Sequence, residues 1–307
     1  MIYPMKEIIQ IREISKNYDG ITAVDNLTLS IPEGTIYGIL GPNGAGKTTT
    51  LRITLNIIEP DSGEVLFRNK KVNLETLNRV GYLPEERGLY PKETAIEVLI
   101  YLALLKGMKK IEARKRAMEL LEKFGLRDRA DAKIEELSKG MQQKLQFISV
   151  LIHDPEILIL DEPFSGLDPI NAELLRETIM GEKAKGKTII FSTHILEQAE
   201  KMCDYVALIS RGRKVVDGKL SEIKASYGKR TVKIEFDGNG EALREIPHKS
   251  LRLYERFAEI ETDLEINEIL RRLLDRVKII KIERTEPTLN QVYFNLVGGE
   301  GENSHNN

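Results

Sequence analysis

The sequence lacks several features that mark whole classes of proteins. It has one cysteine, Cys203, among 307 residues, so disulfide bonds are no part of its design and a reducing cytoplasm fits its chemistry. Its net charge of −2 provides no global basic surface, so we expect no nucleic-acid partner. Hydrophobic residues make up 41% and charged residues 31% of the chain, which is a globular rather than a disordered composition.

Long apolar runs are missing as well. The most apolar stretch, residues 96–105 (IEVLIYLALL), contains Glu97 and falls well short of the roughly 20 residues of a transmembrane helix. The N-terminal stretch MIYPMKEIIQ has no apolar core of the length that a signal peptide needs. We therefore expect a cytoplasmic protein, and a partner must supply the membrane span if the chain works at a membrane.

Hydrophobic periodicity predicts an α/β body. Short apolar or alternating runs predict strands at residues 8–14, 27–31, 35–40, 63–67, 79–84, 156–163, 186–193 and 205–212. From residue 92 to about 150, leucine and alanine recur at three- and four-residue spacing, which predicts helices. The alternation of strands and helices implies a parallel sheet with helices on both faces, and the helical block at about 89–150 is interpreted as an insertion.

The pattern changes after about residue 221. Strand-like runs at 230–236, 256–262 and 278–284 accompany helical runs at 264–277 and 288–297. We therefore predict an α/β domain at residues 1–222, a small α+β domain at residues 223–297 and a disordered tail at residues 298–307.

A glycine-rich loop, GPNGAGKT at residues 41–48, fits the pattern G-x-x-x-x-G-K-[ST] between a predicted strand and a predicted helix. Its glycines let successive backbone N–H groups turn toward an anion, and the following helix adds the positive end of its dipole. We expect Lys47 to reach the β and γ phosphates of a nucleotide and Thr48 to place its hydroxyl on Mg²⁺.

Acidic and imidazole side chains follow two later strands. The run ILILDEP delivers Asp161 and Glu162 to the C-terminal end of a buried strand, where ligands bind in open α/β sheets. Asp161 is expected to hold Mg²⁺ through water, and Glu162 to polarise an attacking water. The run IIFSTH places His194 after a strand that can lie beside the strand of the glycine-rich loop, within reach of a γ-phosphate. Alone, an acidic pair or a histidine at a strand end is also a common loop feature.

Together these motifs resemble the ATP-binding subunit of ABC transporters over about residues 10–221. The resemblance rests on the Walker A motif at 41–48, the signature LSKGM at 137–141, the Walker B motif at 157–161 with Glu162, the D-loop SGLDP at 165–169 and the switch His194. It implies a P-loop ABC cassette with a helical insertion subdomain at about 89–150, and it places the α+β domain as a C-terminal addition.

The resemblance also implies roles for single residues. The catalytic residues would be Lys47, Glu162 and His194, the magnesium ligands Thr48, Glu85 and Asp161, and the residues that contact ATP Tyr18, Gly41, Pro42, Asn43, Gly44, Ala45, Gly46, Lys47, Thr48, Thr49, Glu85, Ser138, Gly140, Met141 and Asp168. In such ATPases the signature helix of one cassette caps the nucleotide held by the Walker A loop of another. Two head-to-tail cassettes then bury two ATP molecules. Tyr18 would stack on adenine, although by itself it is interpreted as an edge-strand tyrosine.

The signature departs from the family pattern, which usually reads Leu-Ser-Gly-Gly-Gln. Lys139 and Met141 stand at its third and fifth positions, while Ser138 and Gly140 remain. The change removes a possible amide contact to ribose and adds a positive charge near a triphosphate. We expect ATP-driven pairing to survive it.

A second departure lies in GYLPEERGLYP. Glu85 stands where the family usually has a glutamine that reaches Mg²⁺ and the attacking water, and the adjacent Glu86 leaves the register open by one residue. A carboxylate could still bind Mg²⁺ directly or through water, or could repel the γ-phosphate when no metal is present.

PEERGLYP and LSKGMQQK together resemble one subgroup of exporter ATPases, the sodium-extrusion or multidrug type, which carries a C-terminal extension. We therefore expect an ATPase with ATP and Mg²⁺ as cofactors, peripheral on the inner face of the cell membrane. It would pair as a homodimer, or with a paralogous cassette, and drive a separately encoded transmembrane permease, for export.

Two other functions are weighed against this one. A soluble ABC ATPase acting on the ribosome or DNA usually has two cassettes or a long coiled coil, whereas this chain has one P-loop and no sustained heptads. A nucleotide-binding module without hydrolysis disagrees with the presence of Lys47, Glu162 and His194.

Overall fold

The computed structural model describes residues 6–86, 88–227, 231–274 and 276–297, and the chain divides into two units between Lys219 and Leu220. The predicted tail at residues 298–307 lies outside the described residues. Each unit has a hydrophobic core of its own, as independent domains do.

A six-stranded sheet lies at the centre of the first unit. Its strands in spatial order are β10 (Arg213–Lys219), β9 (Tyr205–Ser210), β3 (Ile36–Leu40), β8 (Thr188–Thr193), β7 (Ile157–Asp161) and β6 (Val80–Leu83). Neighbours pair in parallel, as predicted, except that β10 runs antiparallel to β9. Every residue of β3, β7 and β8 is buried, because layers on both faces cover these strands.

A second, antiparallel sheet shares its core with the first. Its strands in spatial order are β2 (Ile21–Pro32), β1 (Glu7–Tyr18), β4 (Ser62–Phe67) and β5 (Lys70–Lys71). Asp19 and Gly20 join β1 to β2 with φ angles of 47° and 86°, the left-handed pair that a tight hairpin turn requires. Apolar residues of both sheets and of α1 (Lys47–Thr54) form one cluster.

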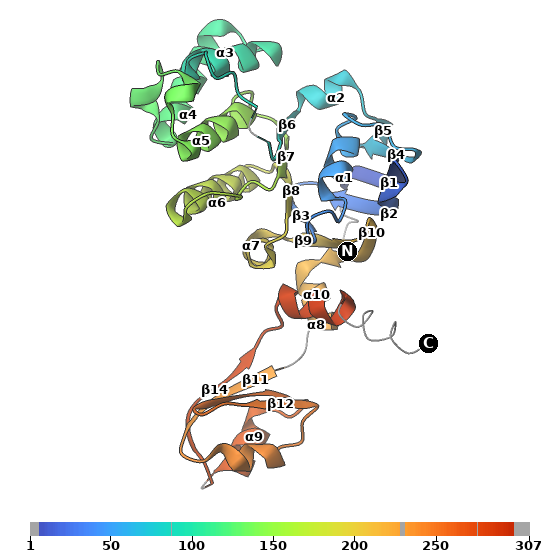
Figure 1. Ribbon diagram of the computed structural model, residues 1–307, viewed down its shortest axis with the longest axis vertical. Helices are drawn as coiled ribbons and strands as arrows, with labels where there is room; N and C mark the ends of the chain where they lie inside the picture. Colours follow the sequence, from blue (N-terminus) through green and yellow to red (C-terminus); the bar gives the residue numbers. More distant parts are fainter. Residues whose placement is uncertain (1–5, 87, 228–230, 275, 298–307) are drawn as a thin grey trace. The chain divides into compact units, whose positions relative to one another are not determined.

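The two faces of the central sheet are covered differently. In Figure 1, α5 (Lys139–Leu151), α6 (Pro169–Ala184) and α7 (Leu196–Met202) lie on one side, whereas α1 shares the other side with the antiparallel sheet. The sequence predicted helices on both faces but not this sheet. The antiparallel sheet covers this face because β2 has one apolar side. Its residues Leu27, Leu29 and Ile31 are buried, and the residues between them are exposed.

The predicted helical block is confirmed. It contains α3 (Ala95–Leu105), α4 (Lys110–Lys123), α5, and 3-10 turns at Arg127–Arg129 and Ile134–Glu136, and a short helix α2 (Leu74–Asn78) precedes β6. A capping box starts α3, because the Thr94 hydroxyl accepts from the Glu97 N–H and the Glu97 carboxylate accepts from the Thr94 N–H. No helix in the described ranges is long and apolar enough to cross a membrane.

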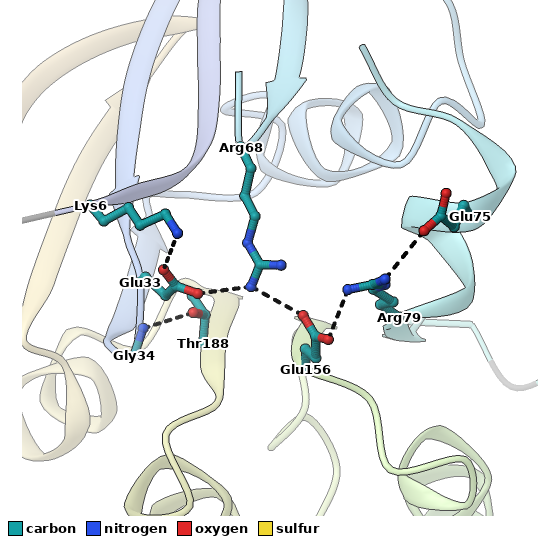
Figure 2. Close-up of polar contacts among 8 residues, drawn as sticks. All are labelled: Lys6, Glu33, Gly34, Arg68, Glu75, Arg79, Glu156 and Thr188. Carbon is teal, nitrogen blue, oxygen red and sulfur yellow. Dashed lines mark hydrogen bonds and ion pairs between the residues drawn. The ribbon is translucent and has the colours of Figure 1, made fainter. Parts of the chain in front are cut away.

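A chain of ion pairs links the two sheets (Figure 2). Arg68, which follows β4, lies 2.8 Å from Glu33 and 3.1 Å from Glu156. Arg79 lies 3.2 Å from Glu156 and 3.2 Å from Glu75 of α2. Glu33 precedes β3 and Glu156 precedes β7, so the ion pairs lie at the N-terminal ends of the parallel strands. Since all five side chains are partly exposed, each pair adds little stability on its own.

The single cysteine packs inside the first unit. Cys203 directly follows α7 and is buried, and a β-carbon on Gly38 of β3 would lie only 2.8 Å from its sulfur. Burial raises the pKa of the Cys203 thiol well above its usual value. Cys203 is therefore a small packing group rather than a nucleophile.

The second unit confirms the predicted α+β composition. Its antiparallel sheet has the order β12 (Ser250–Leu253), β13 (Phe257–Glu261), β11 (Thr231–Asp237) and β14 (Lys278–Thr285), accompanied by α8 (Leu220–Tyr227), α9 (Ile266–Leu273), α10 (Leu289–Val297) and a 3-10 turn at Gly240–Glu245. Val232, Ile234 and Phe236 alternate with less buried residues along β11 and share a core with Ile269 and Leu273 of α9.

Candidate nucleotide site

The register of the parallel sheet places the predicted site residues at one edge. Leu40 pairs with Thr193, and Asp161 pairs with Ser192. The strand that carries His194 therefore lies beside the strand of the glycine-rich loop, as predicted. The segments that leave the sheet at this edge contain the glycine-rich loop, Glu85, Glu162 and His194. Ligands bind at this position in open α/β sheets.

Two glycines of the loop at residues 41–48 lie against other backbone. A β-carbon at Gly41 would lie 2.1 Å from the carbonyl oxygen of Ile209, and one at Gly46 would lie 2.3 Å from that of Ala23. Gly46 also has a φ of 99°, which residues with a β-carbon rarely adopt. Because α1 begins at the next residue, this conformation sets the direction of the first N–H groups of the helix.

Lys47 and Glu162 form the centre of a buried polar cluster. The Lys47 ammonium donates to the carbonyl oxygens of Gly41 and Pro42 at 2.9 and 3.1 Å, and it lies 3.4 Å from Oε1 of Glu162. The same Oε1 lies 3.0 Å from Nδ1 of His194, whose side chain is 43% exposed. A buried carboxylate needs such partners to compensate for lost hydration, so one oxygen of Glu162 joins the loop lysine to the histidine.

The backbone of Glu162 has an unusual conformation. Its φ is 46°, in the left-handed region that residues other than glycine seldom occupy. Its N–H donates to Oγ of Ser192 at 3.0 Å, which holds the turn directly after β7. Conformations of this kind cluster at functional sites, because the surrounding structure has to enforce them.

Asp161 offers a buried oxygen that fits a cation. The residue is 1% exposed, and its Oδ1 accepts from the Ser192 hydroxyl at 2.5 Å. Its Oδ2 is buried and has no hydrogen-bond partner among the described residues. Those residues include no group of three or more histidines, cysteines or carboxylates that could hold a metal by itself. Mg²⁺ takes most of its ligands from water and phosphate, so Asp161 and the Thr48 hydroxyl fit an ion that arrives with a nucleotide.

A hollow of about 450 Å³ collects most of the predicted nucleotide contacts. Its lining residues are Tyr18, Ala23, Asn43, Gly44, Gly46, Lys47, Thr48, Thr49, Glu85 and Glu162. Tyr18 stands at the end of β1 with 41% of its surface exposed. Glu85 belongs to this lining, whereas Glu86 does not.

The remaining residues of the loop do not line the hollow. Gly41 and Pro42 direct their carbonyl oxygens at Lys47. Ala45 is 1% exposed, and its carbonyl oxygen accepts from the N–H of Gly212 at 3.1 Å. These three residues therefore fix the conformation of the loop without lining the hollow.

The signature and the D-loop form a second cluster. Ser138 caps α5, because its Oγ accepts from the N–H of Met141 at 3.3 Å. Asp168 caps α6 by accepting from the N–H of Asn171 at 3.0 Å, and this hydrogen bond lowers the pKa of Asp168. A β-carbon on Gly140 would lie 3.7 Å from the amide nitrogen of Asn171, so the two helix starts are neighbours. None of the four predicted residues in this cluster lines the hollow.

Sequence reasoning missed several polar residues that support these clusters. Ser192 contacts both acidic residues at the end of β7, and Asn171 bonds to Asp168 of the D-loop and lies close to Gly140 of the signature. Gln143 and Gln146 of α5 donate to carbonyl oxygens of Ser165 and Glu86. Nothing in the sequence marks the partners of the glutamines, and the partner of Ser192 depends on a strand register that the sequence does not specify.

Comparisons with known proteins agree with these observations. A family model described as "ABC transporter" matches residues 24–165, and one described as "ATP-binding protein DrrA1-3-like, C-terminal domain" matches residues 218–297.

Among related proteins, the chain is 43% identical over 296 residues to the uncharacterized ABC transporter ATP-binding protein YhaQ of Bacillus subtilis (strain 168), covering 95% of this chain and 99% of that protein. It is 39% identical over 222 residues to the Nod factor export ATP-binding protein I of Cupriavidus metallidurans, covering 71% and 73%. A solved dimeric ATP-binding cassette in a post-hydrolysis state, bound to ADP and Pi, has a TM-score of 0.64 at 28% identity, covering 69% of this chain and 99% of that one. With this full-length similarity, the chain belongs to the ABC transporter ATP-binding proteins and is an ATPase of that family.

Proposed function

We propose that this ATPase works as a head-to-tail dimer that binds two molecules of ATP with Mg²⁺ and drives a separately encoded membrane permease in export. The observation that carries the proposal is the division of its site into two clusters. Lys47 and Glu162 line the hollow, whereas Ser138 and Asp168 cap two neighbouring helices and do not line it. A second chain in the opposite orientation would bring its capped helices to the phosphates in the first hollow.

The first cluster provides the groups that act on the phosphates. Lys47 would exchange the carbonyl oxygens of Gly41 and Pro42 for phosphate oxygens, which keeps its ammonium bonded throughout. Glu162, oriented by its contact with His194, would accept a proton from the attacking water. Thr48, Glu85 and Asp161 would hold Mg²⁺, which would supply positive charge for phosphoryl transfer.

The second cluster provides donors at the open end of a helix. The first N–H groups of α5 have no partner within the helix apart from the bond that Ser138 accepts, so they can bond phosphate oxygens. Lys139, at the first helical position, would add a positive charge beside the same phosphates. Asp168 would cross the interface from the start of α6.

Export is supported by two similarities. The motif pair PEERGLYP and LSKGMQQK resembles exporter ATPases, and the relative from Cupriavidus metallidurans is named for Nod factor export. If the chain drives a membrane permease, affinity purification from detergent-solubilised membranes should recover a polytopic membrane protein with the tagged chain. Recovery of ribosomes or DNA in its place would favour the soluble alternative.

ATP-driven pairing tests the dimer directly. Glu162→Gln keeps the size of the side chain but removes the base, so ATP should stay bound and hold two chains together. We expect a monomer without nucleotide, a dimer with ATP and Mg²⁺, and hydrolysis at least about a hundredfold below wild type. Size-exclusion chromatography with light scattering measures the mass, and phosphate release measures the rate.

Glu119→Gln is the matched control. Glu119 is a half-exposed residue of α4 that contacts Arg116, so this variant should hydrolyse ATP like the wild type. A Glu162→Gln chain that binds ATP yet remains a monomer at high protein concentration would contradict the head-to-tail dimer.

A further inference from the structure

Three glutamines of α5 bond to three different segments. Gln142 donates from Nε2 to the carbonyl oxygens of Ile134 and Leu137, both at 3.0 Å, and so holds the chain that leads into its own helix. Gln143 and Gln146 donate to segments on other parts of the fold. Both of those segments carry a residue that lines the hollow.

Gln146 contacts the loop that carries Glu85. Its side chain is 7% exposed, and its Nε2 lies 3.1 Å from the carbonyl oxygen of Glu86 and 3.4 Å from that of Pro84. These carbonyl groups belong to the residues on either side of Glu85, whose side chain lines the hollow. One buried amide group thus fixes the backbone on both sides of a predicted magnesium ligand.

Gln143 makes a similar contact to the segment after Glu162. Its Nε2 lies 2.8 Å from the carbonyl oxygen of Ser165 and 3.4 Å from that of Pro163. Its Oε1 is buried and has no hydrogen-bond partner among the described residues, so this amide is satisfied on one side only. The contact made by Gln146 is therefore the clearer of the two.

We propose that Gln146 is a positioning residue for ATP hydrolysis, which couples the signature end of α5 to Glu85 in the hollow of the same chain. The inference rests on the proposed head-to-tail dimer, in which Ser138 meets the nucleotide held by the partner. Because α5 is a single helix from Lys139 to Leu151, Ser138 and Gln146 move together. A nucleotide that holds the signature end in place then also holds the Glu85 loop of the neighbouring site, so each site responds to occupation of the other.

The central variant is Gln146→Met. Methionine has nearly the same length and volume but donates no hydrogen bond, so it releases the two carbonyl oxygens without opening a cavity. We expect kcat to fall about tenfold, because a loop that carries a catalytic group is less well placed. The KM for ATP should stay within about twofold, because the P-loop is untouched, and the rate should lose its cooperative dependence on ATP concentration.

The matched control is Gln10→Met. It makes the same substitution in β1 and removes two hydrogen bonds, one donated to Glu7 at 2.7 Å and one accepted from Arg12 at 2.6 Å. None of these three residues lines the hollow or belongs to the signature, so kcat and cooperativity should stay near the wild-type values.

A third variant adds a readout that a purely structural role would not move. In Gln146→Glu, an ionised carboxylate repels the two carbonyl oxygens, whereas a protonated one donates to one of them. The ratio of its kcat to that of Gln146→Met should therefore rise as the pH is lowered from about 8 to about 6, since burial among carbonyl groups favours protonation.

The outcomes separate the inference from the function on which it rests. Failure of the proposed function shows in the wild-type chain and in Glu162→Gln, before any glutamine is changed. If those behave as expected, a selective loss of kcat and cooperativity in Gln146→Met supports the coupling. Equal losses of activity in Gln10→Met and Gln146→Met, or unchanged kinetics in Gln146→Met, overturn it.

Discussion

The two clusters of the nucleotide site are built in opposite ways. Around the hollow, Lys47, Asp161 and Glu162 are 6%, 1% and 8% exposed, and their partners come from several strands and loops. Around the signature, Ser138 and Asp168 are exposed, and each bonds to the first turn of its own helix. The first cluster depends on tertiary structure, and the second on local helix capping.

This difference fits the proposal that one chain holds a nucleotide by itself and needs a partner for hydrolysis. The hollow has the glycine-rich loop and the proposed base Glu162 in its lining, and Asp161, with its buried unpartnered oxygen, precedes Glu162 in the same unit. The signature cluster offers donors on a surface with no phosphate in the same chain to accept them. Changes on the first side should therefore affect ATP binding, whereas changes on the second should affect only steps that need two chains.

The largest expected effect is on the hollow, through Gly46→Ala. The new β-carbon would lie 2.3 Å from the carbonyl oxygen of Ala23, at a φ of 99°. We expect ATP affinity to fall about a hundredfold, because strain of about 1–3 kcal/mol displaces the loop. Titration of the purified chain with a fluorescent ATP analogue measures it.

Gly107→Ala separates conformational strain from damage to the loop. Gly107 has a φ of 86°, with no atom within 4 Å of its added β-carbon, and it lies outside both clusters. This control should lower thermal stability and leave ATP affinity unchanged. Equal affinity losses in the two variants would mean that the loop at residues 41–48 is not the binding element.

A smaller effect, about a tenfold loss of hydrolysis, is expected on the signature side from Ser138→Asp. Aspartate caps a helix about as well as serine, so α5 should keep its stability. Its negative charge would instead face the phosphates of the partner's nucleotide and repel them. Circular dichroism, ATP titration and phosphate release together test this, and the single chain should bind ATP as before. Wild-type hydrolysis by Ser138→Asp would remove the signature from the proposed interface.

The smallest effect is expected on stability at low pH, through His153, which belongs to neither cluster. Burial lowers the pKa of His153 to about 4, aided by repulsion from Lys106, and its Nε2 bonds to the carbonyl oxygen of Val80 at 3.3 Å. Because the unfolded chain takes up this proton near the ordinary histidine pKa of 6.5, the unfolded state binds more protons between the two pKa values. Stability present above about pH 6.5 is therefore lost as the pH falls toward 4, by at most about 3 kcal/mol.

His153→Gln should remove this pH dependence. Denaturant unfolding of variant and wild type at several pH values measures it, and ATP affinity at neutral pH should be equal in both. A slope that persists in the variant would assign the pH dependence to other groups.

Much of the fold was predictable because its signals are local. Continuous apolar runs predicted β3, β7 and β8, and three- and four-residue spacing predicted the helical block. The antiparallel β10 was missed because most of its residues are only partly buried and its sequence, RKVVDGK, has little apolar character. The ion pairs of Figure 2 were missed because Arg68 and Glu156 are 88 residues apart, and only the folded sheets bring them together.

The candidate site shows the same difference between local motifs and long-range contacts. The glycine-rich loop, the acidic pair and the signature could be recognised in the sequence, because each is a short motif. The contacts of Ser192 with Asp161 and of Gln146 with the Glu85 loop were not, because both depend on which strands and helices lie side by side. Sequence reasoning therefore predicted the motif residues of the candidate site, but not the residues that hold those motifs in place.

The buried Cys203 has a practical consequence for experiments. A thiol that is kept protonated inside the protein reacts slowly with maleimides and iodoacetamides, which attack the thiolate. A single cysteine introduced on the surface can therefore carry a fluorophore or spin label without first removing the native one. One label on a cysteine that replaces Lys139, and another on a cysteine beside the hollow of a second chain, would report the approach of two chains in real time.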